Sequence, residues 1–81
     1  MIHLLLKKIN NYLTGDITLQ QLEGFLLSNL QGILESGDAV AIHTANQVDA
    51  DIVELGENII DKATFNKRLK TYVVSYGAVK L

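Results

Sequence analysis

A chain of 81 residues is long enough for one domain with a modest hydrophobic core. It contains no cysteine, which excludes disulfides and thiolate metal sites, and its net charge is only −2. The absence of proline and the many Leu, Ile, Ala and Gln residues favour an all-α fold, with residues 1–81 as a single helical domain.

The apolar start of the chain, Met1–Leu6, is followed at once by Lys7 and Lys8. A membrane-spanning helix needs about 20 apolar residues, and a signal peptide carries a charged segment before its apolar one. The sequence therefore predicts a cytoplasmic protein with no membrane association.

A first helix is predicted over residues 2–13, with Leu4 outside its apolar stripe and so exposed or covered by a partner. Gly15 can take the left-handed conformation that ends such a helix. Thr18 and Gln21 then have the spacing of a capping box, which begins a second helix. A connection this short makes the two helices antiparallel neighbours.

The same stretch resembles small uncharacterised bacterial helical proteins, which often open with a similar turn and a Leu-rich second helix. The residues that carry the resemblance are Tyr12, Leu13, Gly15, Ile17, Leu19, Leu22 and Glu23. They cover about the first third of the chain. The resemblance implies a small helical domain and brings with it no activity, cofactor or site residue.

The second helix is predicted over residues 19–34 and is expected to be the most buried, because its only charge is Glu23. Its broad apolar stripe consists of Leu19, Leu22, Leu26, Leu30, Ile33 and Leu34, extended on its edges by Phe25 and Leu27.

Three small residues of this helix, Gly24, Ser28 and Gly32, are spaced by four and form a ridge. In one interpretation Gly24 is merely tolerated and Gly32 loosens the end of the helix. In the other, another helix packs closely against the ridge, as small residues allow. That helix would belong either to this chain, through Ala41 and Ala45, or to a second copy.

A third helix is predicted over residues 39–55, with Asp38 as its N-cap. Ile42 and Val53 widen its apolar edge. The opposite, solvated face is expected to carry His43, Gln47, Asp51 and Glu54.

A fourth helix is predicted over residues 62–76, with Asp61 as its N-cap. Its buried stripe consists of Phe65, Leu69, Tyr72, Val73 and Tyr76. The four predicted helices together indicate an all-α antiparallel bundle.

Charge is distributed unevenly along the chain, because all nine acids lie between Asp16 and Asp61 and only basic residues follow. The acidic third helix and the basic fourth helix can complement each other within one bundle. Alternatively, Lys67, Arg68 and Lys70 bind an acidic protein partner.

No motif for catalysis, metal binding or a cofactor is present. His43, Gln47 and Asp51 are spaced by four, but they are too few firm ligands for a metal site. If the second and third helices formed a helix-turn-helix, the third would be the recognition helix. That helix carries acids and no Lys or Arg, whereas contacts to phosphates need positive charge. We therefore predict no catalytic, metal or cofactor residue, and nucleic-acid binding through the basic fourth helix is the least favoured reading.

The sequence is best interpreted as a small non-catalytic protein-interaction module that forms a homodimer. The predicted interface residues are Leu4, Gly24, Ser28, Gly32, Ile42 and Val53. The alternative is a small ligand-binding protein or hydrolase, with a pocket between helices lined by Glu23, Asp49 and Tyr12 or Tyr72.

Overall fold

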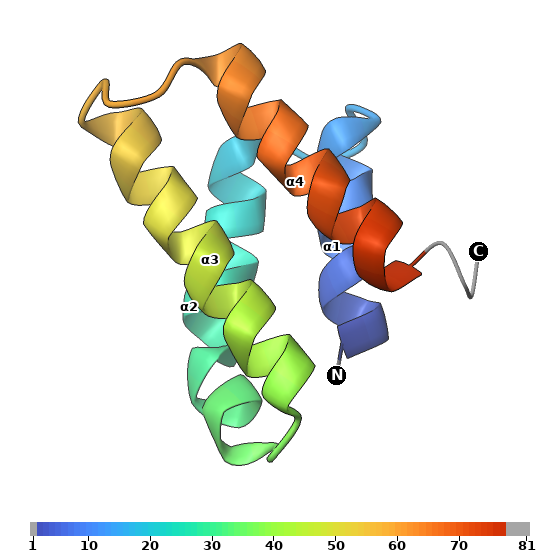
Figure 1. Ribbon diagram of the computed structural model, residues 1–81. Helices are drawn as coiled ribbons and strands as arrows, with labels where there is room; N and C mark the ends of the chain where they lie inside the picture. The colour runs from blue at the N-terminus through green and yellow to red at the C-terminus, as the bar shows by residue number, and fades with distance from the viewer. Residues whose placement is uncertain (1, 78–81) are drawn as a thin grey trace.

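The computed structural model describes residues 2–77, which form four helices that alternate in direction (Figure 1). They are α1 (Ile2–Leu13), α2 (Leu19–Glu35), α3 (Ala39–Gly56) and α4 (Lys62–Gly77). In Figure 1, α2 and α3 lie side by side on the left, and α1 and α4 on the right. The all-α bundle predicted from the sequence is confirmed, and α2, α3 and α4 each extend one residue beyond the predicted end.

Both α1 and α3 pack against every other helix, whereas the backbones of α2 and α4 stay apart within the residues that the structure describes. The bundle is therefore two pairs, α1 with α4 and α2 with α3. In this arrangement α1 and α3 cover the inner side of α2, and the outer side of α2 is exposed.

The turn between α1 and α2 has the predicted capping box. The Gln21 backbone N–H donates to the Thr18 hydroxyl at 3.1 Å, and the Thr18 N–H donates to the Gln21 side-chain oxygen at 2.8 Å. Gly15 has a φ of +86°, which side-chain-bearing residues rarely adopt. The predicted end of α1 and start of α2 are both confirmed.

Aspartates cap the N-termini of α3 and α4, as predicted. The Asp38 carboxylate accepts from the Ala41 N–H at 3.1 Å, and the Asp61 carboxylate accepts from the Thr64 N–H at 2.8 Å. The hydrogen bond from Thr64 lowers the pKa of the Asp61 carboxyl below its ordinary value. Each cap satisfies a backbone donor that has no partner within the helix.

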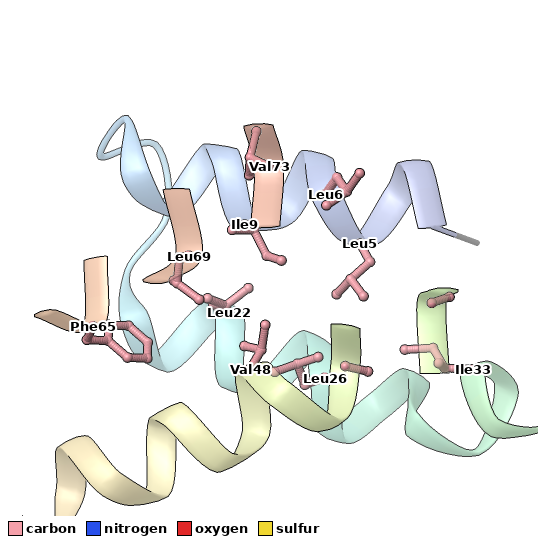
Figure 2. Close-up of a cluster of buried hydrophobic side chains, with 12 residues drawn as sticks. Leu5, Leu6, Ile9, Leu22, Leu26, Ile33, Val48, Phe65, Leu69 and Val73 are labelled. Carbon is pink, nitrogen blue, oxygen red and sulfur yellow. The ribbon is translucent and has the colours of Figure 1, made fainter. Parts of the chain in front are cut away.

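The hydrophobic core lies where the four helices converge, and every helix contributes to it (Figure 2). Full burial of a side chain such as Phe65 or Leu22 stabilises the fold by about 1.5–3 kcal/mol. The core consists of Leu5, Leu6, Ile9, Leu22, Leu26, Ile33, Ala41, Ala45, Val48, Phe65, Leu69 and Val73.

The prediction that the second helix is the most buried is wrong. More residues are buried on α3 than on α2, where Leu27 and Leu34 of the predicted stripe are 70% and 46% exposed. The stripe is broader than the surface that α1 and α3 can cover. Tyr76 is also exposed rather than buried, because it lies in the last turn of α4, beside the beginning of α1.

None of the helices in the described part of the chain combines the length and the apolar character that crossing a membrane requires.

Candidate functional site

A cluster of polar side chains joins α3 to α4, and at its centre is Asp51, which is only 2% exposed. The Tyr72 hydroxyl donates to the Asp51 carboxylate at 2.6 Å, and Arg68 Nη1 donates to it at 3.0 Å. The same Arg68 nitrogen also donates to the Glu54 carboxylate at 2.6 Å. We call these four residues the Asp51 cluster.

Helical spacing brings the four side chains together. Asp51 and Glu54 are one turn apart on α3, and Arg68 and Tyr72 are one turn apart on α4, so each pair shares a face. The prediction that Asp51 faces solvent is wrong, because α4 covers this side of α3. The complementarity of an acidic third and a basic fourth helix is confirmed by the two ion pairs of Arg68.

The charges in the Asp51 cluster fix the protonation of its donors. Burial, and then the hydrogen bond to Asp51, raise the pKa of the Tyr72 phenol above its ordinary value of 10.0. The hydrogen bonds to Glu54 and then to Asp51 raise the pKa of the Arg68 guanidinium. Tyr72 therefore stays a neutral donor and Arg68 a cation, which together offset the cost of burying a carboxylate.

The Asp51 cluster is arranged for holding helices together rather than for reaction. A general base or nucleophile has to be reached by a substrate, and Asp51 is only 2% exposed. Its carboxylate accepts from Tyr72 and Arg68, and Arg68 also donates to Glu54. No buried side-chain nitrogen or oxygen lacks a partner in the described residues. The cluster therefore holds α3 against α4.

A second polar contact joins α1 to α4. The Tyr12 hydroxyl donates to Asn66 Oδ1 at 2.8 Å, and the Tyr12 ring meets Phe65 edge-on, with centroids 5.9 Å apart. Burial raises the pKa of the Tyr12 phenol. The two tyrosines thus serve different helix pairs, and both Glu23 and Asp49 are exposed. A pocket lined by Glu23, Asp49 and one of the tyrosines stays a prediction.

The predicted ridge of Gly24, Ser28 and Gly32 lies on the exposed side of α2. A Cβ placed on Gly24 or Gly32 would have no heavy atom within 4 Å beyond its own helix neighbourhood. Ala41 and Ala45 are buried in the core and do not meet this ridge. The interpretation of the ridge as a contact within one chain is therefore wrong, and an approach by a second copy stays a prediction.

Leu4 and Val53 are exposed as predicted, whereas Ile42 is partly buried against the core. Leu4 is on α1, whereas Ile42 and Val53 are on α3. The side chain of Lys8, one turn after Leu4, lies over the Phe25 ring at 5.7 Å, so the Phe25 edge of α2 faces α1.

The opposite edge of α2, which carries Leu27 and Leu34, consequently faces away from α1. On α3, Asp51 and Glu54 face α4, so Ile42 and Val53 lie on the edge that faces away from α4. These two edges adjoin, because α2 packs on α3. They form one surface, which we call the α2–α3 face and which consists of Glu23, Leu27, Leu34, Ile42, Asn46, Asp49 and Val53.

The sequence identified Ile42 and Val53 in this face and missed Leu27 and Leu34. The helical periodicity places both leucines in the buried stripe of the second helix. The signal that could have found them is the width of that stripe, which exceeds what two neighbouring helices can cover.

Comparisons of the chain with protein-family models, with curated proteins and with solved structures found no match. The resemblance to small bacterial helical proteins stays a prediction.

Proposed function

We propose that this protein is a small non-catalytic interaction module that associates with itself, with a homodimer as the smallest assembly. The observation that carries the proposal is the α2–α3 face. It combines three well-exposed apolar side chains, Leu27, Leu34 and Val53, with the partly buried Ile42.

Several well-exposed apolar side chains on one surface favour an interface. A domain of this size buries a smaller fraction of its surface than a larger domain does, and association is a common way to bury more. The exposed Gly24 ridge borders the α2–α3 face on the outer side of α2, whereas Leu4 is on α1, outside the face. Of the predicted interface residues, Ile42 and Val53 belong to this surface.

The alternative, a ligand-binding protein or hydrolase with a pocket between helices, has no observation in its favour. Glu23 and Asp49 are exposed, and Tyr12 and Tyr72 are each bound to a side chain of this chain. We keep the cytoplasm as the proposed compartment, on the sequence reasoning alone.

The test is to replace Leu27 and Val53 together by serine and to measure association by sedimentation equilibrium from about 1 to several hundred micromolar. Both side chains are well exposed, so the variant should keep its helical circular dichroism and lose association. The matched control is Ile59→Ser, which removes an apolar side chain that is 63% exposed in the α3–α4 connection, outside the face. A monomeric unmodified protein, or equal loss in both variants, would refute the proposal.

A further inference from the structure

The outer side of α4 carries a second unpartnered surface. Ala63, Lys67, Lys70 and Val74 follow one another at intervals of four, three and four residues, which is the spacing of a helical contact seam. All four side chains are exposed, Val74 to 60%. We call this row the α4 seam. It is apolar at both ends and basic in the middle.

Two shallow depressions border the α4 seam, and both are lined by Lys67 and Lys70. The first, of about 370 Å³, is completed by Leu13, Ala63 and Asn66. The second, of about 320 Å³, is completed by Thr71, Val74 and Ser75. Shallow hollows in series along a helix suit an elongated partner, such as another helix, better than a small molecule, which needs an enclosed site.

Neither lysine of the seam forms an ion pair within residues 2–77. The ion pairs of the described residues are those of Arg68, which points to the other side of α4, toward Asp51 and Glu54. The partner of the α4 seam should therefore offer carboxylates between apolar residues.

The α2–α3 face of a second copy has this chemistry. On α3, the residues Ile42, Asn46, Asp49 and Val53 follow one another at the same intervals of four, three and four. This row is also apolar at both ends, and its middle is polar and acidic. Each row spans about 17 Å of helix.

The intervals read the same in both directions, so the two rows match whether the helices run parallel or antiparallel. In either orientation Asp49 meets one of the two lysines of the seam and Asn46 meets the other. The side-chain oxygen of Asn46 can accept a hydrogen bond from a lysine ammonium, although it supplies no opposite charge.

A second carboxylate lies on the α2–α3 face. Figure 2 shows Leu22 of α2 near Val48 of α3 in the core, and Glu23 and Asp49 are the next residues along each helix. Both are exposed, and neither forms an ion pair within the described residues. Two free acids on one face thus match two free lysines on the other.

We infer that the protein associates head to tail, with the α4 seam of one copy on the α2–α3 face of the next. This inference rests on the proposed self-association and names the surface that the α2–α3 face contacts. Arg68 and Tyr72 mark the edge of α4 toward α3, and the seam lies on the opposite edge, so the two surfaces are on opposite sides of the bundle. A head-to-tail dimer therefore keeps one free α4 seam and one free α2–α3 face. Further copies can add to these surfaces, so larger assemblies should form as the protein concentration rises.

The test uses two charge-reversed proteins. One is Lys67→Glu with Lys70→Glu, and the other is Glu23→Lys with Asp49→Lys. Each alone brings like charges together at the contact, and its association constant should fall by about tenfold or more. An equimolar mixture should associate again, because each altered surface then meets a surface of opposite charge. Association of the unmodified protein should also weaken as salt is raised.

The control variant, Lys7→Glu with Lys62→Glu, has the same net charge as the first protein but is altered outside the seam, and it should associate normally. If the Lys67 and Lys70 variant associates as the unmodified protein does, the α4 seam is not the partner, although self-association through the α2–α3 face stands. If the mixture fails to associate while each protein is folded, the charge pairing is refuted. A monomeric unmodified protein would refute both proposals.

Discussion

Replacing Gly24 by alanine is expected to stabilise the dissociated protein. Gly24 is in the middle of α2 and exposed, and a Cβ built on it meets no heavy atom within 4 Å. Alanine loses less backbone entropy than glycine on entering a helix, and nothing in the chain opposes the added methyl group. The free energy of unfolding should rise by about 0.5–1 kcal/mol.

The measurement is urea unfolding followed by circular dichroism, at a protein concentration low enough to keep the chain monomeric. A gain of this size should also raise the melting temperature by a few degrees, since about 1 kcal/mol corresponds to roughly 4–8 °C in a domain this small. The matched control is Gly15→Ala, because Gly15 also has open space around its Cβ but a φ of +86°. This variant should be destabilised by about 1–2 kcal/mol.

A loss of stability in Gly24→Ala at low concentration would refute the reasoning, because it would mean that another part of the chain packs on the ridge. The same comparison of Gly24→Ala with the unmodified protein at high concentration shows which surface of α2, the Gly24 ridge or the α2–α3 face, contacts a second copy. If Gly24→Ala weakens association there, the Gly24 ridge takes part in the contact between copies. If it leaves association unchanged, the contact is confined to the α2–α3 face.

Three further predictions follow from the core, the Asp51 cluster and the first cap. Leu22→Ala should lower the free energy of unfolding by about 2–5 kcal/mol, a large part of the stability of a small domain, as chemical denaturation would show. Tyr72→Phe should cost about 1–3 kcal/mol, because it leaves an oxygen of the buried Asp51 without its donor. The raised pKa of Tyr72 adds stability that is complete below the ordinary value of 10.0 and is lost as the pH rises from there toward the raised pKa, so the difference in unfolding free energy between the two proteins should begin to shrink above pH 10. Thr18→Ala should cost about 0.5–2 kcal/mol in the same assay, whereas Thr18→Ser should cost little, because serine keeps the cap to Gln21.

The helix starts could be predicted from sequence because their causes are local. Thr18 and Gln21 satisfy each other within four residues, and Asp38 and Asp61 each bind a backbone N–H three residues on. A local hydrogen bond of this kind needs no knowledge of the tertiary fold. The predicted helix ends, which depend on less specific signals, are short by one residue in three of the four cases.

Burial could be predicted less well, because it depends on which helices meet. The periodicity of α2 indicates a wide apolar stripe but does not show which part of it α1 and α3 cover. Leu27 and Leu34 are exposed because they lie on the edge of the stripe that faces away from α1. The same limit applies to Asp51, which is predicted on the solvated face of its helix, yet is buried because α4 lies over it.

The Asp51 cluster also determines what the outer side of α4 can bind. Arg68 carries the planar donor group that pairs best with a single carboxylate or phosphate, and the cluster directs it inward. Lys67 and Lys70 remain on the outside as two separate point charges, about one helical turn apart. Two separate charges suit a partner whose carboxylates are spread along a surface. They suit a partner with a single doubly charged group less well. The α2–α3 face of a second copy offers such spread carboxylates. A nucleic acid also offers spread negative charges, but it would not contact the apolar ends of the seam at Ala63 and Val74. Changing Val74 to serine should therefore weaken self-association and leave any residual binding to nucleic acid unchanged.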